Sequence, residues 1–377
     1  MSPSQRSEIS GISIIVPVKG RLDLLHKLLN SLHLAIIPIF RESTEVLLIW
    51  DGPLSPLALA QSFVEKFGMV IRCIFYQGDQ ASKRNAGCSI ARFDLMLFID
   101  SDCTIHTDLL ICLKELFSLT TVMAAAPPVY FDDIEGMCAK ANAQMPYRQA
   151  YNWGSSNRPQ WWLPAATLAV RREAMEKIGH FWAPSYGPTR GEDVDWGLRL
   201  TSSMGYPAIL TLPNCPSRHA PETWCKATSS IRRAWWFGWS EGDLRRRHFQ
   251  FQRWSLPPFL TGGILICLTA ISVSTFITSQ AIILIIFGAF QLCIWLGLVV
   301  RNLHSVGMRG PANIAFLGMN FVYNISRTLS LWFSGSLTGG MWFHELQIKG
   351  AWEELVTTGW LFWALGMVTC LTALIFL

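Results

Sequence analysis

The chain has 377 residues, of which 51% are hydrophobic, and its formal net charge is +5. This length allows one large domain or two smaller ones, each with a proper core. The positive charge is small and dispersed, which argues against nucleic acid as the main partner. The ten cysteines show no C-x-x-C spacing, so zinc sites and disulfide frameworks are poorly supported, and reduced thiols in a cytoplasmic domain are expected.

Strands and helices alternate in the first part of the chain. Residues 11–19 form a short β-branched run that predicts a buried first strand, and leucines at helical spacing follow it. Further strands are expected at 44–52, 69–78 and 94–102, and further helices at 56–68 and 81–93. This alternation predicts an α/β fold with a doubly wound, mostly parallel sheet.

The C-terminal part is strongly apolar, with no charged residue between 255 and 300. We therefore expect a globular domain over 1–250 and a membrane domain over 251–377. Its spans are predicted at 256–277, 281–300, 311–333 and 359–377. The segment 311–333 is the weakest, because Asn320, Asn324 and Arg327 interrupt it, and a helix lying in the membrane interface is the alternative.

The distribution of basic residues around the apolar segments predicts the orientation of the protein. Arginines precede the first predicted span and follow the second, at Arg245 to Arg247, Arg253, Arg301 and Arg309. This pattern places the globular domain on the cytoplasmic side of an integral plasma (inner) membrane protein. The N-terminus lacks an apolar stretch, so no cleavable signal peptide is expected.

Two acidic clusters are the first candidates for chemistry. Asp100 and Asp102 follow a buried strand, and two carboxylates at this spacing can reach one Mg²⁺ or Mn²⁺ ion. A polar turn or a helix cap is the plain alternative. Glu192, Asp193 and Asp195 crowd the first turn of a predicted helix that ends near Gly205. Helix starts favour acids, but mutual repulsion among three should raise at least one pKa, which suits a general base.

Basic and aromatic residues complete the set of candidates. The sequence SKRNAG at 82–87 opens a helix after a strand, so Lys83, Arg84 and the backbone N–H groups could bind an anion, with ordinary solvated side chains as the alternative. Trp161 and Trp162 lie between the two acidic clusters. They could contact a ligand or a lipid, or they could simply belong to the core.

Five features occur in a fixed order along roughly residues 11–250: a strand ending at Pro17, DG after the second strand, KRNAG, DSD and GED. This order resembles that of the family 2 glycosyltransferases. The resemblance implies the GT-A fold, which is Rossmann-like. The segment from Ser217 to His248 looks like the membrane-attached members of that family, including the mycofactocin-type glycosyltransferases.

The resemblance also implies roles for individual residues. Nucleotide-sugar binding falls to Pro17, Val18, Asp51, Arg84 and Asp100. Asp102 binds the metal ion, Mg²⁺ or Mn²⁺, with Asp100 beside it and His219 as a further candidate ligand. Asp193 is the catalytic base and Glu192 positions the acceptor. Trp161, Trp162, Asp195 and Arg233 are candidate acceptor contacts.

These roles imply an enzyme that moves one sugar, with inversion, from a nucleotide sugar to a lipid-linked or glycan acceptor at a membrane. Trp50 stands where many members carry an acid that reads uracil, so the nucleotide stays open. A processive polysaccharide synthase is an alternative, because Gln250, Arg253 and Trp254 match Q-x-x-R-W. A non-catalytic membrane scaffold is another. A sugar-phosphate nucleotidyltransferase is disfavoured, because its chemistry requires a glycine-rich loop after the first strand, where only Gly20 is found.

Overall fold

The computed structural model describes residues 9–36, 43–131, 135–182, 191–220, 226–248, 253–254, 289, 292, 311–333 and 340–341. The chain divides into two compact units, of which the first comprises Met1–Ile134 with Pro146–Thr223 and the second Glu135–Met145 with Trp224–Leu377. Each unit is described by itself.

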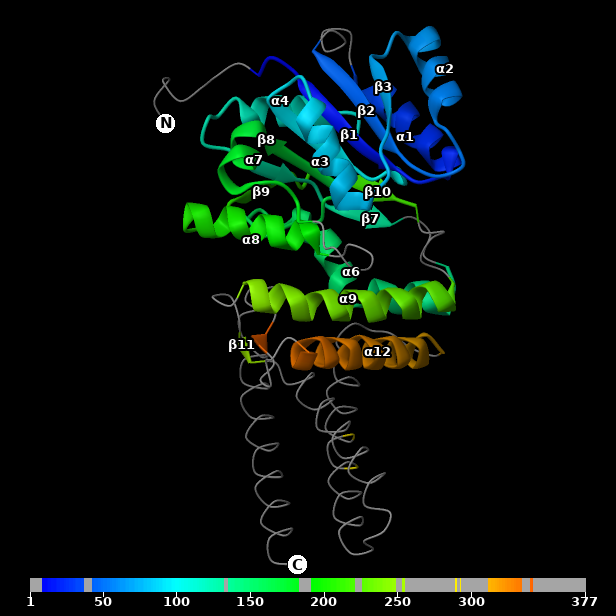
Figure 1. Cartoon of the computed structure of the whole chain (residues 1–377), viewed down its shortest axis with the longest axis vertical. Coiled ribbons are helices and arrows are strands. Elements are labelled where there is room, and N and C mark those ends of the chain that lie inside the picture. Colours follow the sequence, from blue (N-terminus) through cyan, green and yellow to red (C-terminus); the bar gives the residue numbers. More distant parts are fainter. Residues whose placement is uncertain are drawn as a thin grey trace, which may run out of the picture. The chain divides into compact units, whose positions relative to one another are not determined.

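A seven-stranded sheet organises the first unit, in the order β3-β2-β1-β4-β8-β6-β9 (Figure 1). Its strands are β1 Ile12–Val18, β2 Thr44–Trp50, β3 Ile71–Phe75, β4 Leu95–Ile99, β6 Ala124–Ala126, β8 Thr167–Arg171 and β9 Ile209–Thr211. β1 pairs in parallel with β2 and β4, and β2 pairs in parallel with β3. The first four predicted strands are therefore confirmed. β8 runs antiparallel to both of its neighbours, which the alternating pattern did not predict.

Helices pack on both faces of this sheet. They are α1 Leu22–Ala35, α2 Leu57–Phe67, α3 Gln80–Ile90, α4 Leu109–Phe117, α7 Arg172–Ile178 and α8 Glu192–Met204. The unit also contains α6 Pro146–Gln149 and the 3₁₀ segment η3 Ala150–Ser155. Ile14 and Val16 of β1 belong to a core with α1, α2 and α4, whereas Ile15 between them belongs to a core with α3, α7 and α8. Because successive strand residues point to opposite faces, the two cores confirm a doubly wound sheet.

A small second sheet lies in the same unit, in the order β5-β10-β7. It is made of β5 Cys103–Thr104, β10 Ser217–His219 and β7 Val129–Phe131. β10 pairs His219 with Cys103, which follows Asp102 directly. This pairing brings a residue from far along the chain next to the acidic turn after β4.

The second unit contains α5 Met137–Ala143, α9 Ala227–Arg247, α12 Pro311–Phe333 and the short strands β11 Arg253–Trp254 and β12 Gly340–Met341. α9 and α12 pack closely, because Gly238 lies against the carbonyl of Tyr323 and Ser326 donates to the carbonyl of Trp235 at 2.6 Å. Glu241 pairs with Arg327 at 2.9 Å in this interface. The sequence analysis assigned α9 to the first domain, whereas contacts assign it to the second unit.

In the described part of the chain, no helix is both long enough and apolar enough to cross a membrane. This finding includes α12, so the span expected over 311–333 is not supported. The physical reason is that polar and charged side chains make α12 too hydrophilic, since Asn320, Asn324 and Arg327 all lie on this helix. The spans expected at 256–277, 281–300 and 359–377 lie outside the described residues, apart from single positions.

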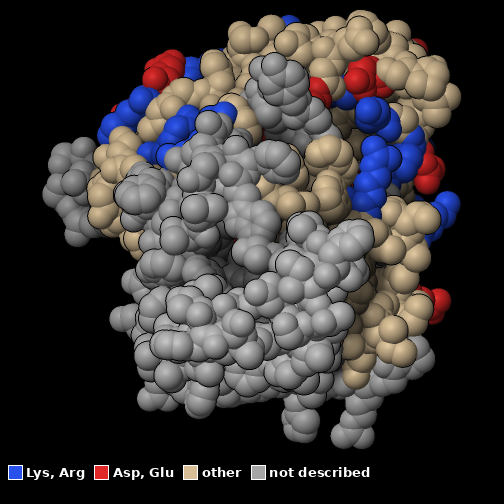
Figure 2. Space-filling model, turned by 60° about the horizontal axis from the view of Figure 1, so that its bottom comes forward, with Lys and Arg blue, Asp and Glu red and all other residues tan. Residues whose placement is uncertain are grey.

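Charges of both signs lie on the surface of the described residues. Figure 2 shows Lys and Arg side chains in separate groups on one face, with Asp and Glu side chains nearby and not one continuous basic surface.

A glycine on α8 provides a test of how closely this helix packs against Trp162. A Cβ atom at Gly197 would lie 2.6 Å from Cβ and 2.8 Å from Cα of Trp162. We expect Gly197→Ala to destabilise the protein by about 1–3 kcal/mol through overpacking. The matched control is Gly318→Ala on α12, where a Cβ meets nothing within 4 Å and alanine should be neutral or stabilising. Urea unfolding of both variants measures the difference, and equal effects would contradict this account.

Candidate active site

The carboxyl ends of β1, β2 and β4 meet at one edge of the main sheet. Asp51 follows β2 directly, and Asp100 follows β4. In open α/β sheets, ligands bind beyond this edge, at the strand where the order reverses. Here β1 is that strand, because β2 lies on one side of it and β4 on the other.

Lys83 joins the ends of β1 and β2. Its Nζ donates to the carbonyl of Val18 at 3.0 Å and forms an ion pair with Asp51. The backbone N–H of Asp51 donates to the same carbonyl at 3.3 Å. Pro17 and Val18 are buried at the end of β1, with Pro17 opposite Ile49 in the parallel register. Pro17, Val18 and Asp51 therefore lie together, as the resemblance requires.

Arg84 connects the two acidic clusters. Its side chain is only 2% exposed, and its guanidinium contacts Asp100 Oδ1 at 2.8 Å and Glu192 Oε1 at 2.6 Å. Gln80 of the same helix donates to Asp100 Oδ1 at 2.6 Å. Asp100 and Glu192 are far apart in the sequence, so the fold brings the turn after β4 and the start of α8 together.

The expected anion site at the start of α3 stays a prediction, because its two basic side chains are already paired within the fold. The side chain of Asp79 caps this helix by accepting from the backbone N–H of Ser82 at 2.8 Å. Lys83 and Arg84 are 3% and 2% exposed and are paired with carboxylates. Both charges therefore compensate acids within the fold, and a contact of Arg84 with the donor stays a prediction.

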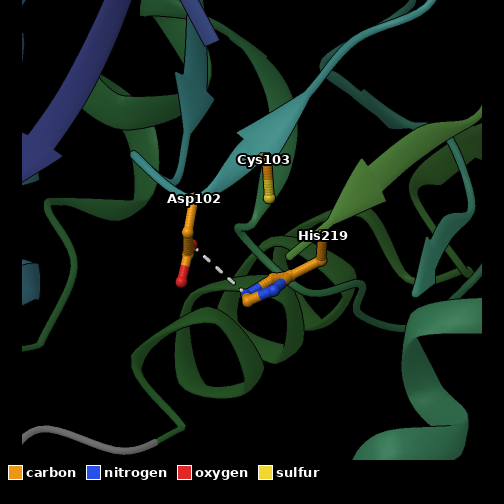
Figure 3. Close-up of side chains that lie close together, drawn as sticks. All are labelled: Asp102, Cys103 and His219. Atoms are coloured by element: carbon orange, nitrogen blue, oxygen red, sulfur yellow. Dashed lines mark ion pairs between the residues drawn. The ribbon is translucent and has the colours of Figure 1, made fainter. Parts of the chain in front are cut away.

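Asp102 lies between two basic side chains. Arg21 donates to Asp102 Oδ2 at 2.6 Å, and His219 Nε2 lies 3.3 Å from Asp102 Oδ1 (Figure 3). Arg21 has a φ of +51°, in the left-handed region, directly after Gly20 at +66°. Among the described residues, it is the one non-glycine residue with positive φ. Such strained backbone is concentrated at functional sites, and here the residue that carries it is bound to Asp102.

Asp102, Cys103 and His219 can be tested as a metal site, because one ligand atom from each lies within 4.8 Å of the others. His219 Nδ1 lies 2.9 Å from the carbonyl of Ala220, which can only accept, so Nδ1 carries a proton. Nε2 then faces the Asp102 carboxylate, either as a second N–H donor or as a lone pair that shares a divalent cation with this carboxylate. Asp102 and His219 therefore fit a metal ion.

Cys103 and Asp100 fit the same ion less well. Burial raises the pKa of the Cys103 thiol well above its usual value, and the charge of Asp102 adds to this effect. Before a metal ion binds, these effects favour the thiol over the thiolate. One oxygen of Asp100 accepts from Arg84 and from Gln80, so its predicted role beside Asp102 stays a prediction.

Asp193 lies in the first turn of α8, beside Glu192. Its Oδ2 accepts from the backbone N–H of Ala165 at 3.1 Å, and its Oδ1 from that of Val194 at 2.8 Å. Burial raises the pKa of Asp193 from 3.8 to about 7, and the neighbouring charge of Glu192 contributes further. The sequence predicted a raised pKa in this cluster from repulsion alone, whereas burial is the larger cause.

The raised pKa of Asp193 predicts a pH dependence. If Asp193 accepts a proton from substrate, activity should rise about tenfold per pH unit below pH 7 and level off above it. Stability should change in the opposite direction, because the folded protein binds this proton more tightly than the unfolded chain. The stabilising contribution is present below pH 4 and lost as pH rises through about 7. Rate and thermal unfolding measured from pH 5 to 9 test both signs, and a flat rate profile would contradict the assignment.

The candidate acceptor residues are placed differently from one another. Trp162 is buried and packs edge-on against Trp153, and Trp161 is half-buried, with its carbonyl accepting from Thr201. Asp195 is buried and pairs with Arg199 on the same helix at 2.8 Å. Arg233 lies on α9, in the second unit. The structure gives Trp162 and Asp195 packing and pairing contacts within the fold, so their acceptor role stays a prediction.

Several partners of the acids escaped the sequence analysis. Arg21 binds Asp102, Lys83 binds Asp51, and Gln80 binds Asp100. For Arg21, the signal was available, since a glycine followed by a charged residue directly after a strand predicts a turn close to the strand end.

Comparisons with known proteins agree with this geometry. The model of the family described as Glycosyl transferase family 2 matches residues 13–179. The mannosyltransferase PcManGT from Pyrobaculum calidifontis, solved in complex with GDP-Man and Mn²⁺, is 14% identical, with 87% of this chain and 88% of that chain covered and a TM-score of 0.53. A crystal structure of S. aureus TarS 1-349 is 17% identical, with 64% of this chain and 72% of that chain covered and a TM-score of 0.45. No curated protein matches the chain.

The family match spans β1 to the end of α7, which includes the strand ends with Asp51, Asp100 and Asp102. The likeness to the mannosyltransferase extends over most of the chain and supports the same fold. Residues 13–179 thus match the glycosyl transferase family 2 model, which supports a transferase function, and the likeness to the mannosyltransferase supports the GT-A fold.

Proposed function

We propose that the protein transfers one sugar, with inversion, from a nucleotide sugar to a hydroxyl or phosphate of a membrane-associated acceptor. The observation that carries this proposal is the Arg84 bridge, with its guanidinium on both Asp100 and Glu192. Through this bridge, the acids beside the candidate metal site and the acids beside the candidate base belong to one site. A single displacement needs these two groups of acids together.

On the donor side, we assign Asp102 and His219 as the residues that hold a divalent ion. When bound, Mg²⁺ or Mn²⁺ would neutralise charge on the departing nucleoside diphosphate. Arg21, 41% exposed and bound to Asp102, supplies a further positive charge on this side. The similar mannosyltransferase structure contains GDP-Man and Mn²⁺, and Trp50 replaces the acid expected of a uridine reader, so a guanosine donor is the first to test.

On the acceptor side, we assign Asp193 as the base that removes the proton of the attacking hydroxyl. A carboxyl group with a pKa of about 7 is well matched to this task at neutral pH. Two backbone N–H groups hold its oxygens in place. Glu192, fixed by Arg84, would position the acceptor.

The acceptor class follows from the sequence of the C-terminal part. The absence of charge between 255 and 300, with arginines on either side, supports attachment to the inner membrane with the catalytic domain on the cytoplasmic side. An enzyme held there meets polyprenyl phosphates, lipid-linked sugars and growing envelope glycans. The same features fit the membrane-attached, mycofactocin-type members of the family.

The function is tested with the purified full chain, Mn²⁺ and a panel of nucleotide sugars, with a polyprenyl phosphate or a lipid-linked sugar as acceptor. We expect one donor to be consumed, with inverted configuration at the anomeric carbon by NMR. Chelation of the metal should stop the reaction. Failure to transfer or hydrolyse any donor would contradict the proposal, and retained configuration would contradict the single displacement.

Asp102→Ala separates metal-dependent donor binding from the fold. We expect this variant to lose the Mn²⁺-dependent part of nucleotide binding in calorimetry, because Asp102 is the carboxylate of the site. Asp108→Ala, six residues later and with a side chain 63% exposed, is the matched control and should bind as the unchanged protein does. Equal nucleotide affinities in the two variants would exclude Asp102 from the metal site.

A further inference from the structure

Two cysteines far apart in the chain meet in the first unit. Cys112 lies on α4, and Cys215 lies between β9 and β10. Their Sγ atoms are 2.8 Å apart, although 103 positions separate the residues. No short-range spacing in the sequence marks this pair.

Both sulfur atoms are held by ordered backbone. Cys112 is in the helix, where its N–H donates to the carbonyl of Asp108 at 2.9 Å. Cys215 lies between Pro213 and Pro216 and donates to the carbonyl of Leu212 at 3.2 Å. The prolines restrict φ on both sides of this turn. A disulfide bond of about 2.05 Å therefore needs the sulfurs to close by roughly 0.8 Å.

We propose that Cys112 and Cys215 are a modification site that forms a reversible intramolecular disulfide bond. The oxidant is a low-molecular-weight disulfide such as glutathione disulfide. The Cys112 sulfur attacks it, forming a mixed disulfide and releasing one thiol. Cys215 then attacks the Cys112 sulfur and releases the second thiol. Both cysteine protons leave to solvent or to the released thiolates, and the small disulfide takes up the two electrons.

The order of these steps follows from exposure. Cys112 is half-buried, so a small disulfide can reach it, whereas Cys215 is 3% exposed. Burial also raises the pKa of Cys215 to about 12, which makes it a poor first nucleophile. Cys112 therefore reacts first, and Cys215 resolves the mixed disulfide within the fold.

The bond would tie α4 to the segment that leads into β10. β10 begins at Ser217 and ends at His219, the candidate metal ligand beside Asp102. A cross-link over so long a separation removes much freedom from the unfolded chain. The oxidised protein is therefore more stable, and the cross-link lies two residues before the strand that carries His219.

The pair is tested by oxidising the native full chain with glutathione disulfide and mapping tryptic peptides by mass spectrometry. We expect one linked peptide pair, residues 93–114 with residues 200–218, that reductant separates. Because 93–114 also contains Cys103, the pair must disappear in Cys112→Ser. We expect the melting temperature to rise by about 5 °C or more on oxidation.

Cys73→Ser is the matched control, since Cys73 is a half-buried free cysteine in the same unit. It should leave both the linked peptides and the rise in melting temperature unchanged. Cys215→Ser should abolish both and leave a mixed disulfide on Cys112, which identifies the first nucleophile. Absence of the linked peptides in the oxidised protein, or their persistence in Cys112→Ser, would overturn the proposal.

Discussion

Asp193→Asn is expected to lower kcat by about 10²–10⁴-fold, because the amide cannot accept the proton of the attacking hydroxyl. Binding of the donor and metal should change little, since the side-chain oxygens of Asp193 accept from the backbone N–H groups of Ala165 and Val194. Asparagine keeps one oxygen for these groups. Steady-state rates together with nucleotide affinity by calorimetry separate the two effects.

Asp23→Asn is the control for this variant. Asp23 also lies in the first turn of a helix, α1, but it is exposed. Asp23→Asn therefore removes the same charge at the start of a helix, but away from the candidate active site. If Asp193→Asn keeps more than a tenth of the rate, or if its rate still rises with pH through 7, Asp193 is not the base.

Arg84→Met is expected to have the largest effect on stability, about 3–5 kcal/mol. The substitution leaves Asp100 and Glu192, with side chains 14% and 8% exposed, facing each other without the cation that separates them. Methionine keeps most of the volume of the side chain, so the loss reports charge and not a cavity. Denaturant unfolding measures the change.

A second substitution checks the cause. Adding Glu192→Gln to Arg84→Met removes one of the stranded charges, so part of the stability should return, and the coupling between the two positions should be clear in a double-mutant cycle. Asp94→Asn is the control, because its side chain is 73% exposed in its pair with Arg172 and such pairs contribute little. Equal losses in Asp94→Asn and Arg84→Met would contradict this account.

Much of the fold could be predicted because local patterns determine it. Alternating apolar runs and leucine spacing gave the first four strands and the helices between them, and glycines marked where helices such as α2 and α8 end. The antiparallel direction of β8 depends on pairing with strands far along the chain. The residues of β8 itself, Thr167–Arg171, show no pattern that indicates the direction of the strand.

The acidic residues of the candidate site could be identified from the sequence, whereas the side chains that pair with them could not. Aspartates at strand ends are visible in the sequence, because an acid directly after a buried run is unusual. Whether Lys83 or Arg84 faces solvent, substrate or another acid depends on how α3 packs on the sheet. Contacts across the fold also decide that Cys112 meets Cys215, which is why scattered cysteines suggested isolated thiols.

The network of Arg21, Lys83 and Arg84 has a consequence for how the enzyme meets its donor. Each of these cations already neutralises an acid at the strand ends. Repulsion among these carboxylates is therefore small before a substrate binds. These pairs restrain the three side chains before any ligand binds. If they contact the donor as proposed, part of the conformational entropy that binding would cost is already lost when the chain folds, which favours affinity.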